Sequence, residues 1–279
     1  MKKIKLLLCL FMLTTLCGCS NSNKNASSKT LNAAMFWIST SLDPTNNYDG
    51  WVLSRIGVGE TLLKLNEKYE VEPCLAKSYE QIDDTTWKLT LKDSITFSNG
   101  KKVTGENVKS CLERAFEKNT RAIDYFDLNH VEAKGQDIYL YLNKSSGAIL
   151  NNLCEPLFTI YDASQSEEDI ANHPLCTGPF VVDDFVSEKT IDTSKNKKYY
   201  DGKAKLDHVH FSQVADSDAR VLALQSGEVD LANTIDYSSL KLFRNNKDYQ
   251  VLEVLGPRTN VIYMNNETTF LSDLTIRKA

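Results

Sequence analysis

Short hydrophobic stretches alternate with polar segments along most of the chain, and their spacing predicts both strands and helices. Residues 31–38 are mostly apolar, and residues 87–91 alternate strictly between apolar and polar, as half-buried strands do. Thr104 precedes a segment with apolar residues at helical spacing, which predicts a capped helix. The expected buried stripe of that helix is Val108, Cys111, Leu112 and Ala115.

Two further segments of the first half have a readable period. Residues 131–133 and 138–142 predict a β-hairpin that turns at Lys134-Gly135. Residues 52–65 carry apolar side chains near helical spacing and predict a helix, although two glycines lower its helical propensity.

The second half of the chain predicts an α/β unit. Residues 206–211 alternate as a strand, and residues 218–226 form an amphipathic helical pattern that Gly227 ends. Residues 228–231 then return as a strand. A strand, a helix and a second strand in this order indicate parallel pairing within one sheet.

The first thirty residues predict the location of the protein. Three lysines precede an apolar run over 6–17, followed by Leu16-Cys17-Gly18-Cys19, which is typical of a bacterial lipoprotein signal. We expect residues 1–18 to be a signal peptide, Cys19 to be lipidated, and residues 19–30 to be a polar tether. The alternative is an ordinary signal that is cleaved nearby. The first interpretation places the protein at the outer face of a membrane, lipid-anchored and extracytoplasmic.

Composition and charge indicate a globular protein and bear on its possible partners. Hydrophobic residues make up 42% of the chain, enough for a globular core. Removing residues 1–18 removes three lysines and no acids, so the net charge changes from −5 to −8. No basic stripe with interleaved aromatic residues is present, so we expect no nucleic-acid partner.

The cysteines outside the expected signal are dispersed. Cys74, Cys111, Cys154 and Cys176 form no CxxC pair and have no metal-site spacing. Buried free thiols are the first interpretation, and one or two disulfides in an oxidising compartment are the alternative.

Catalytic and metal motifs give little support for an enzyme. The chain has no GxSxG, no HExxH and no glycine-rich phosphate loop, so we expect no enzymatic activity and no cofactor. His208 and His210 alternate on one expected strand and would lie about 7 Å apart on one face. Two ligands on a flat strand make a weak site, so we predict no metal centre there.

Nine short motifs in a fixed order resemble the family 5 extracellular solute-binding proteins, which serve dipeptide, oligopeptide and nickel ABC importers. No single motif is specific, but together they span residues 42–279. The motifs are Leu42-Asp43-Pro44, Gly59-Glu60-Thr61-Leu62, residues 73–78, Phe97-Ser98-Asn99-Gly100, Thr177-Gly178-Pro179-Phe180, residues 196–202, residues 224–230, Tyr263-Met264-Asn265 and residues 273–279.

This resemblance implies an α/β fold, a periplasmic-binding-protein-like clamshell of type II, cluster C-like. Residues 31–62 and 175–270 would form the main α/β lobe, and residues 63–174 an inserted subdomain. Residues 271–279 would begin the crossover to a second lobe, which this chain lacks. We therefore interpret the chain as truncated.

The resemblance also implies where the ligand binds. Tyr48, Trp51 and Arg55 follow Asp43-Pro44, where family members line the cleft, and Arg258 lies near the crossover between lobes. Arg121 falls where nickel-chelate binders place an arginine. Aromatic rings supply contact area, and arginine holds a carboxylate by two parallel hydrogen bonds. The alternatives are core packing for Trp51 and surface ion pairs for the arginines.

The ligand itself stays open between a nickel chelate and a peptide. The segment from Tyr48 to Leu62 looks more like nickel or metallophore binders. Against this, nickel-type members can carry an arginine near Cys154-Glu155-Pro156, and this chain has none. We favour nickel chelate, with an ABC permease and its ATPases as partners. A sensor or adhesin lipoprotein that reuses the fold is the alternative function.

Overall fold

The computed structural model describes residues 28–254, 256 and 261–278, and it separates into two compact units. The first unit ends at Ile235 and the second begins at Asp236. The strands are β1 (Thr30–Met35), β2 (Leu63–Leu65), β3 (Val71–Pro73), β4 (Ala76–Gln81), β5 (Thr86–Leu91), β6 (Leu128–Lys134), β7 (Asp137–Leu142), β8 (Phe180–Val186), β9 (Thr190–Lys195), β10 (His208–Gln213) and β11 (Leu231–Ala232). The helices are α2 (Gly50–Arg55), α3 (Gly105–Lys118), α4 (Ala122–Tyr125), α5 (Ile149–Asn152), η1 (Pro156–Phe158), α6 (Glu167–Asn172), α7 (Ser217–Ser226), η2 (Tyr237–Leu242) and α8 (Leu274–Lys278).

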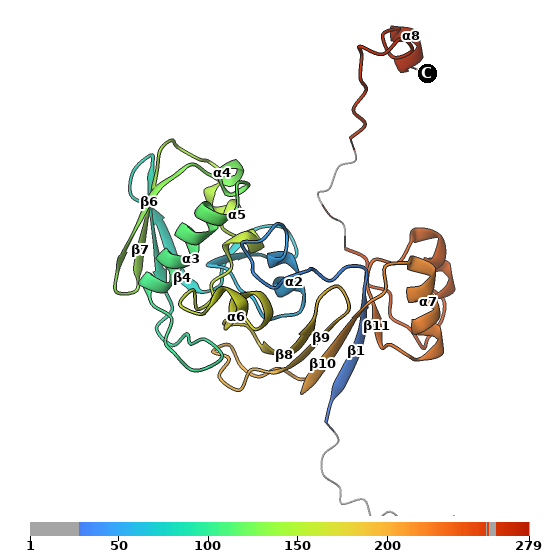
Figure 1. Cartoon of the computed structure of the whole chain (residues 1–279), viewed down its shortest axis with the longest axis horizontal. Helices are drawn as coiled ribbons and strands as arrows, with labels where there is room; N and C mark the ends of the chain where they lie inside the picture. Colours follow the sequence, from blue (N-terminus) through green and yellow to red (C-terminus); the bar gives the residue numbers. More distant parts are fainter. Residues whose placement is uncertain (1–27, 255, 257–260, 279) are drawn as a thin grey trace, which may run out of the picture. The chain divides into compact units, whose positions relative to one another are not determined.

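The largest sheet in the described residues has five strands, and it brings together β1 and β11, from near the two ends of the first unit. Its strand order is β11-β1-β10-β9-β8, and β1 pairs in parallel with both β10 and β11 (Figure 1). Strand β9 pairs antiparallel with β8 on one side and with β10 on the other. The predicted parallel α/β unit is confirmed, because α7 connects β10 to β11 and ends at Gly227 with φ of 76°.

A second sheet has the order β4-β5-β7-β6 and carries α3 against one face (Figure 1). The capped helix is confirmed, because the Thr104 side chain accepts from the Asn107 backbone and the Asn107 side chain accepts from the Thr104 backbone. Val108, Cys111, Leu112 and Ala115 are all buried, as their spacing predicts. The hairpin is confirmed as well, with β6 and β7 paired antiparallel.

The helix expected over residues 52–65 is wrong beyond its first turn. Helix α2 ends at Arg55, Gly57 has φ of 70°, and residues 63–65 form strand β2. The backbone between them pairs with distant segments: Gly178 N–H donates to the Val58 carbonyl at 3.0 Å, and Ile160 N–H donates to the Glu60 carbonyl at 2.9 Å. These long-range hydrogen bonds override the local helical spacing.

The half-buried carboxylate of Glu60 joins the segment after α2 to the second half of the chain. Glu60 accepts hydrogen bonds from Thr177 at 2.8 Å, Tyr199 at 3.1 Å and Tyr200 at 3.2 Å. Burial raises the pKa of Glu60, and the three hydroxyl donors oppose that rise. A half-buried carboxylate whose oxygens all have hydrogen-bond donors fixes the relative position of the segments that supply those donors.

The predicted division at residues 62 and 174 remains a prediction. The two larger sheets follow that division in outline, whereas the two compact units meet at a different boundary, after Ile235. In the second unit many apolar side chains are exposed, among them Tyr263 at 92%. Within the described residues, no helix combines the length and hydrophobicity that crossing a membrane requires. The expected signal peptide and Cys19 lie outside the described residues.

Candidate functional site

Four of the five predicted ligand-binding residues lie around one part of the first unit. Tyr48 precedes α2, Trp51 and Arg55 lie on α2, and Arg121 is the N-cap residue of α4. Tyr48 is 54% exposed and Trp51 is 38% exposed, so both side chains reach the surface, which disfavours the core-packing alternative for Trp51. We call these four residues the arginine–aromatic surface.

Arg121 connects the inserted segment to the loop that carries Tyr48. Its guanidinium carbon lies 3.7 Å from the centroid of the Tyr48 ring. It donates hydrogen bonds to the Asn47 carbonyl at 2.8 Å and to the Tyr125 hydroxyl at 2.7 Å. Stacking and hydrogen bonding together hold the planar guanidinium in one orientation.

The Trp51 indole contacts two charged side chains, Glu155 and Arg55. Its indole Nε1 donates to Glu155 Oε1 at 2.9 Å, and the Arg55 guanidinium carbon lies 5.5 Å from its ring centroid. Arg55 also lies 5.4 Å from the Phe36 ring. An aromatic side chain with a fixed ring plane offers contact area to a ligand at a low cost in conformational entropy.

Sequence reasoning missed two contributors, Glu155 and Tyr125. Glu155 is 104 residues from Trp51 and lies 3.9 Å from Arg121 Nη2. Burial and the nearby Glu155 carboxylate raise the pKa of Tyr125 to about 12. Neither residue belongs to a periodic pattern, so only the fold reveals their place beside the arginine–aromatic surface.

Asn119 also fixes the loop that carries Tyr48. Its side-chain amide donates to the carbonyls of Thr45 and Asn47, both at 3.1 Å, and its oxygen accepts from the Arg121 backbone at 3.0 Å. One buried side chain therefore sets the position of both the loop and Arg121.

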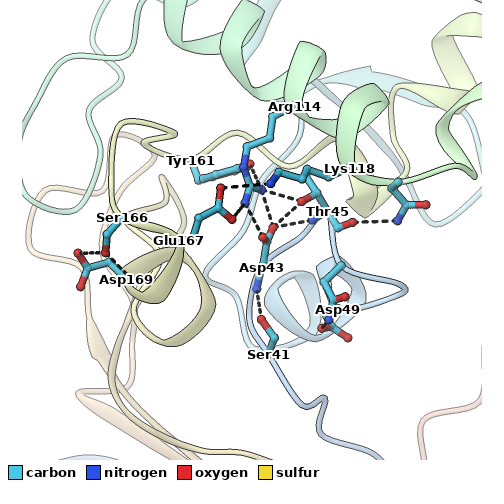
Figure 2. Close-up of polar contacts among 12 residues, drawn as sticks. Ser41, Asp43, Thr45, Asp49, Arg114, Lys118, Tyr161, Ser166, Glu167 and Asp169 are labelled. Carbon is cyan, nitrogen blue, oxygen red and sulfur yellow. Dashed lines mark hydrogen bonds and ion pairs between the residues drawn. The ribbon is translucent and has the colours of Figure 1, made fainter.

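A buried ion-pair network lies beneath the same loop, and Figure 2 shows Arg114 at its centre. Arg114 Nη1 and Nη2 donate to the two Asp43 carboxylate oxygens at 2.8 and 2.7 Å, a bidentate arrangement. Nη1 also donates to Thr45 and Tyr161, and Nη2 to Glu167. Burial alone would raise the pKa of Asp43, but hydrogen bonds from Arg114 and Thr45 outweigh it and lower that pKa.

Asp49, at the N-terminus of α2, behaves in the opposite way. It is 3% exposed, and burial raises its pKa from 3.8 to about 6, against one hydrogen bond from Asn46. Because the folded-state pKa lies above the unfolded value, the folded state binds more protons between these two values. The contribution of Asp49 to the free energy of unfolding should therefore fall as the pH rises from 3.8 to about 6.

We expect Asp49→Asn to remove that decline and to raise the free energy of unfolding at pH 7 by about 1–2 kcal/mol. Urea unfolding at several pH values measures this. Asp93→Asn, at an exposed position, is the control and should change little. A difference in stability between wild type and Asp49→Asn that stays constant between pH 4 and 6, or an Asp49→Asn variant less stable at pH 7, would contradict the assignment.

Arg258 falls outside the described residues. His210 pairs with Asp192 at 2.6 Å, and no cluster of three or more possible metal ligands occurs in the described part of the chain. Cys74, Cys111, Cys154 and Cys176 are free thiols, so the disulfide alternative is not present.

The chemistry available at the arginine–aromatic surface is recognition. Two guanidinium groups can pair with carboxylates, and two aromatic rings can cover an apolar or planar group. One carboxylate, Glu155, lies between the arginine and the tryptophan. The surface therefore suits a small ligand with carboxylate groups.

The chain matches one protein family and is similar to binding proteins of that family. A family model described as bacterial extracellular solute-binding proteins, family 5 Middle, matches residues 70–279. The nickel-binding protein NikA of Staphylococcus aureus is 33% identical over 264 residues, covering 95% of this chain and 52% of NikA. The glutathione-binding protein GsiB of Escherichia coli is 27% identical over 214 residues, covering 73% of this chain and 42% of GsiB.

Solved structures agree with the fold. The crystal structure of S. aureus NikA in complex with Ni(L-His)₂ superposes with a TM-score of 0.74, covering 79% of this chain and 46% of that one. A nickel ABC transporter structure from Bacillus halodurans, 30% identical, gives the same TM-score and coverage. The predicted α/β, periplasmic-binding-protein-like fold is confirmed. The chain spans about half the length of these relatives.

Proposed function

The chain belongs to the family 5 bacterial extracellular solute-binding proteins, and from that premise we propose that it captures a nickel chelate for an ABC importer. The observation that carries the proposal is the 33% identity to a nickel-binding protein over 95% of this chain. The family is one of binding proteins, which agrees with the expectation that the chain is not an enzyme.

The arginine–aromatic surface supports this ligand class. A nickel chelate of amino acids presents carboxylates and planar rings at its periphery, and both match the guanidinium and aromatic groups of Tyr48, Trp51, Arg55 and Arg121. Arg258 belongs to the same proposal as a further carboxylate partner. The proposed partners are the permease and ATPases of the importer, and no nucleic acid.

A peptide ligand is the second candidate, and the similarity to a glutathione-binding protein over 73% of this chain favours it. Titration calorimetry on the intact protein distinguishes the two. We expect Ni²⁺ with two equivalents of L-histidine to bind with a dissociation constant of about 1 μM or tighter, and glutathione or a tetrapeptide to bind far more weakly. Tighter binding of either peptide would overturn the nickel proposal.

We also propose that Cys19 is lipidated and holds the protein at the extracytoplasmic membrane face. Cys19→Ser should then abolish labelling by a radioactive fatty acid and move the protein out of the Triton X-114 detergent phase, since a stable anchor needs acyl chains. Cys74→Ser is the matched control and should leave both measurements unchanged. A Cys19→Ser protein that still carries the label would show that the anchor lies elsewhere.

A further inference from the structure

Glu155 is a carboxylate that contacts two members of the arginine–aromatic surface, Trp51 and Arg121. We propose that Glu155 determines charge selectivity there, favouring ligands that present N–H donors beside their carboxylates over ligands that present carboxylates alone. This inference rests on the proposed function and narrows the class of chelate that the protein would take.

The position of Glu155 is well defined. It precedes Pro156, which restricts its backbone to the extended conformation that the structure shows, with φ of −67° and ψ of 130°. Its side chain is 14% exposed. Its Oε1 accepts from Trp51 Nε1 at 2.9 Å and lies 3.9 Å from Arg121 Nη2. The carboxylate is therefore fixed next to two of the groups proposed to contact the ligand.

Arg121 is already engaged by protein groups. It stacks on Tyr48 and donates to the Asn47 carbonyl and the Tyr125 hydroxyl. A ligand carboxylate that approaches its remaining edge also meets the negative charge of Glu155, and like charges at this distance repel. A purely anionic ligand thus loses part of the attraction that two arginines supply.

An N–H donor on the ligand has the opposite effect. A partly buried carboxylate accepts hydrogen bonds from amine or imidazole N–H groups, and such charge-assisted hydrogen bonds are the stronger kind. A chelate with both carboxylates and N–H groups satisfies Arg121 and Glu155 together. Specificity then comes from one attractive and one repulsive element in the same place.

Two variants separate the charge of Glu155 from its hydrogen bond to Trp51. Glu155→Gln keeps an oxygen acceptor for the indole N–H and removes the charge, whereas Glu155→Leu removes both. The probes are Ni²⁺ with two equivalents of L-histidine, a neutral chelate with N–H donors, and Ni²⁺–EDTA, a dianion with carboxylate ligands. Calorimetry on the intact protein gives the ratio of the two dissociation constants.

We expect Glu155→Gln to shift this ratio about tenfold in favour of Ni²⁺–EDTA. Tryptophan emission should stay at the wild-type wavelength in Glu155→Gln and shift in Glu155→Leu, because only the latter releases the Trp51 indole. A ratio that Glu155→Gln leaves unchanged would overturn this inference and leave the proposed function standing. A wild-type protein that binds neither nickel probe would overturn both.

Discussion

Replacing Arg114 with leucine is expected to lower the free energy of unfolding by about 3–5 kcal/mol, the largest effect that we predict for a single substitution. Arg114 makes two hydrogen bonds to Asp43, and each of the two side chains is about one-tenth exposed. Leucine would leave the Asp43 carboxylate buried without its counter-ion. Urea or thermal unfolding, followed by circular dichroism, measures the loss.

A substitution at the edge of the same network is the control. Lys118 lies 3.5 Å from Glu167, and both side chains are largely exposed. Lys118→Ala should therefore cost less than about 1 kcal/mol. A double variant, Asp43→Asn with Arg114→Leu, should recover part of the stability because no buried charge remains. An Arg114→Leu protein within about 1 kcal/mol of wild type would contradict the role we assign to the network.

The network also positions the loop that carries Tyr48, which links it to the proposed binding surface. The Asp43 carboxylate accepts a hydrogen bond from the Thr45 backbone N–H at 2.9 Å, and the Asn119 amide donates to the Thr45 and Asn47 carbonyls. Contacts from α3 and its C-terminal end thus fix the loop before any ligand arrives. A preorganised surface binds more tightly because less conformational freedom is lost on binding.

Replacing Trp51 with alanine is expected to weaken binding of Ni²⁺–histidine about tenfold to a hundredfold, or about 1.4–2.8 kcal/mol. The indole is 38% exposed, so the free energy of unfolding should change by less than about 1 kcal/mol. Trp51→Phe should retain part of the affinity, since it keeps a smaller aromatic face and loses the N–H bonded to Glu155.

Tyr69→Ala is the matched control for exposure. Tyr69 is 40% exposed and lies in the turn between β2 and β3, which is not one of the segments that carry the arginine–aromatic surface. It should leave affinity unchanged. If Trp51→Ala binds like wild type, Trp51 does not contact the ligand. If Trp51→Ala instead unfolds as readily as a core aromatic variant, with a loss of about 3–5 kcal/mol, its role is packing.

Elements defined by local chemistry could be predicted from the sequence. Thr104 and the stripe from Val108 to Ala115 specify both the start and the buried face of α3. Gly227 ends α7 in the left-handed conformation that glycine tolerates best. In each case the deciding interactions lie within one or two helical turns, which is the range that a periodic pattern reports.

Interactions between distant segments could not be predicted in this way. The helical spacing after Arg55 fails because residues 57–60 pair with residues 160 and 178–180. Arg114 lies 71 residues from Asp43, and Glu155 lies 104 residues from Trp51. Family resemblance suggested Tyr48, Trp51, Arg55 and Arg121 as ligand-binding residues, whereas the charged partners that orient them follow only from the fold.

The central claim is that the ligand lies against the arginine–aromatic surface, and locating bound nickel tests it most directly. Crystals of the intact protein grown with Ni²⁺ and L-histidine, measured at the nickel absorption edge, give the metal position without reference to affinity. We predict an anomalous peak whose chelate contacts the Trp51 ring and the Arg121 guanidinium. A peak at His208 and His210, or a chelate that touches none of Tyr48, Trp51, Arg55 and Arg121, would contradict the account.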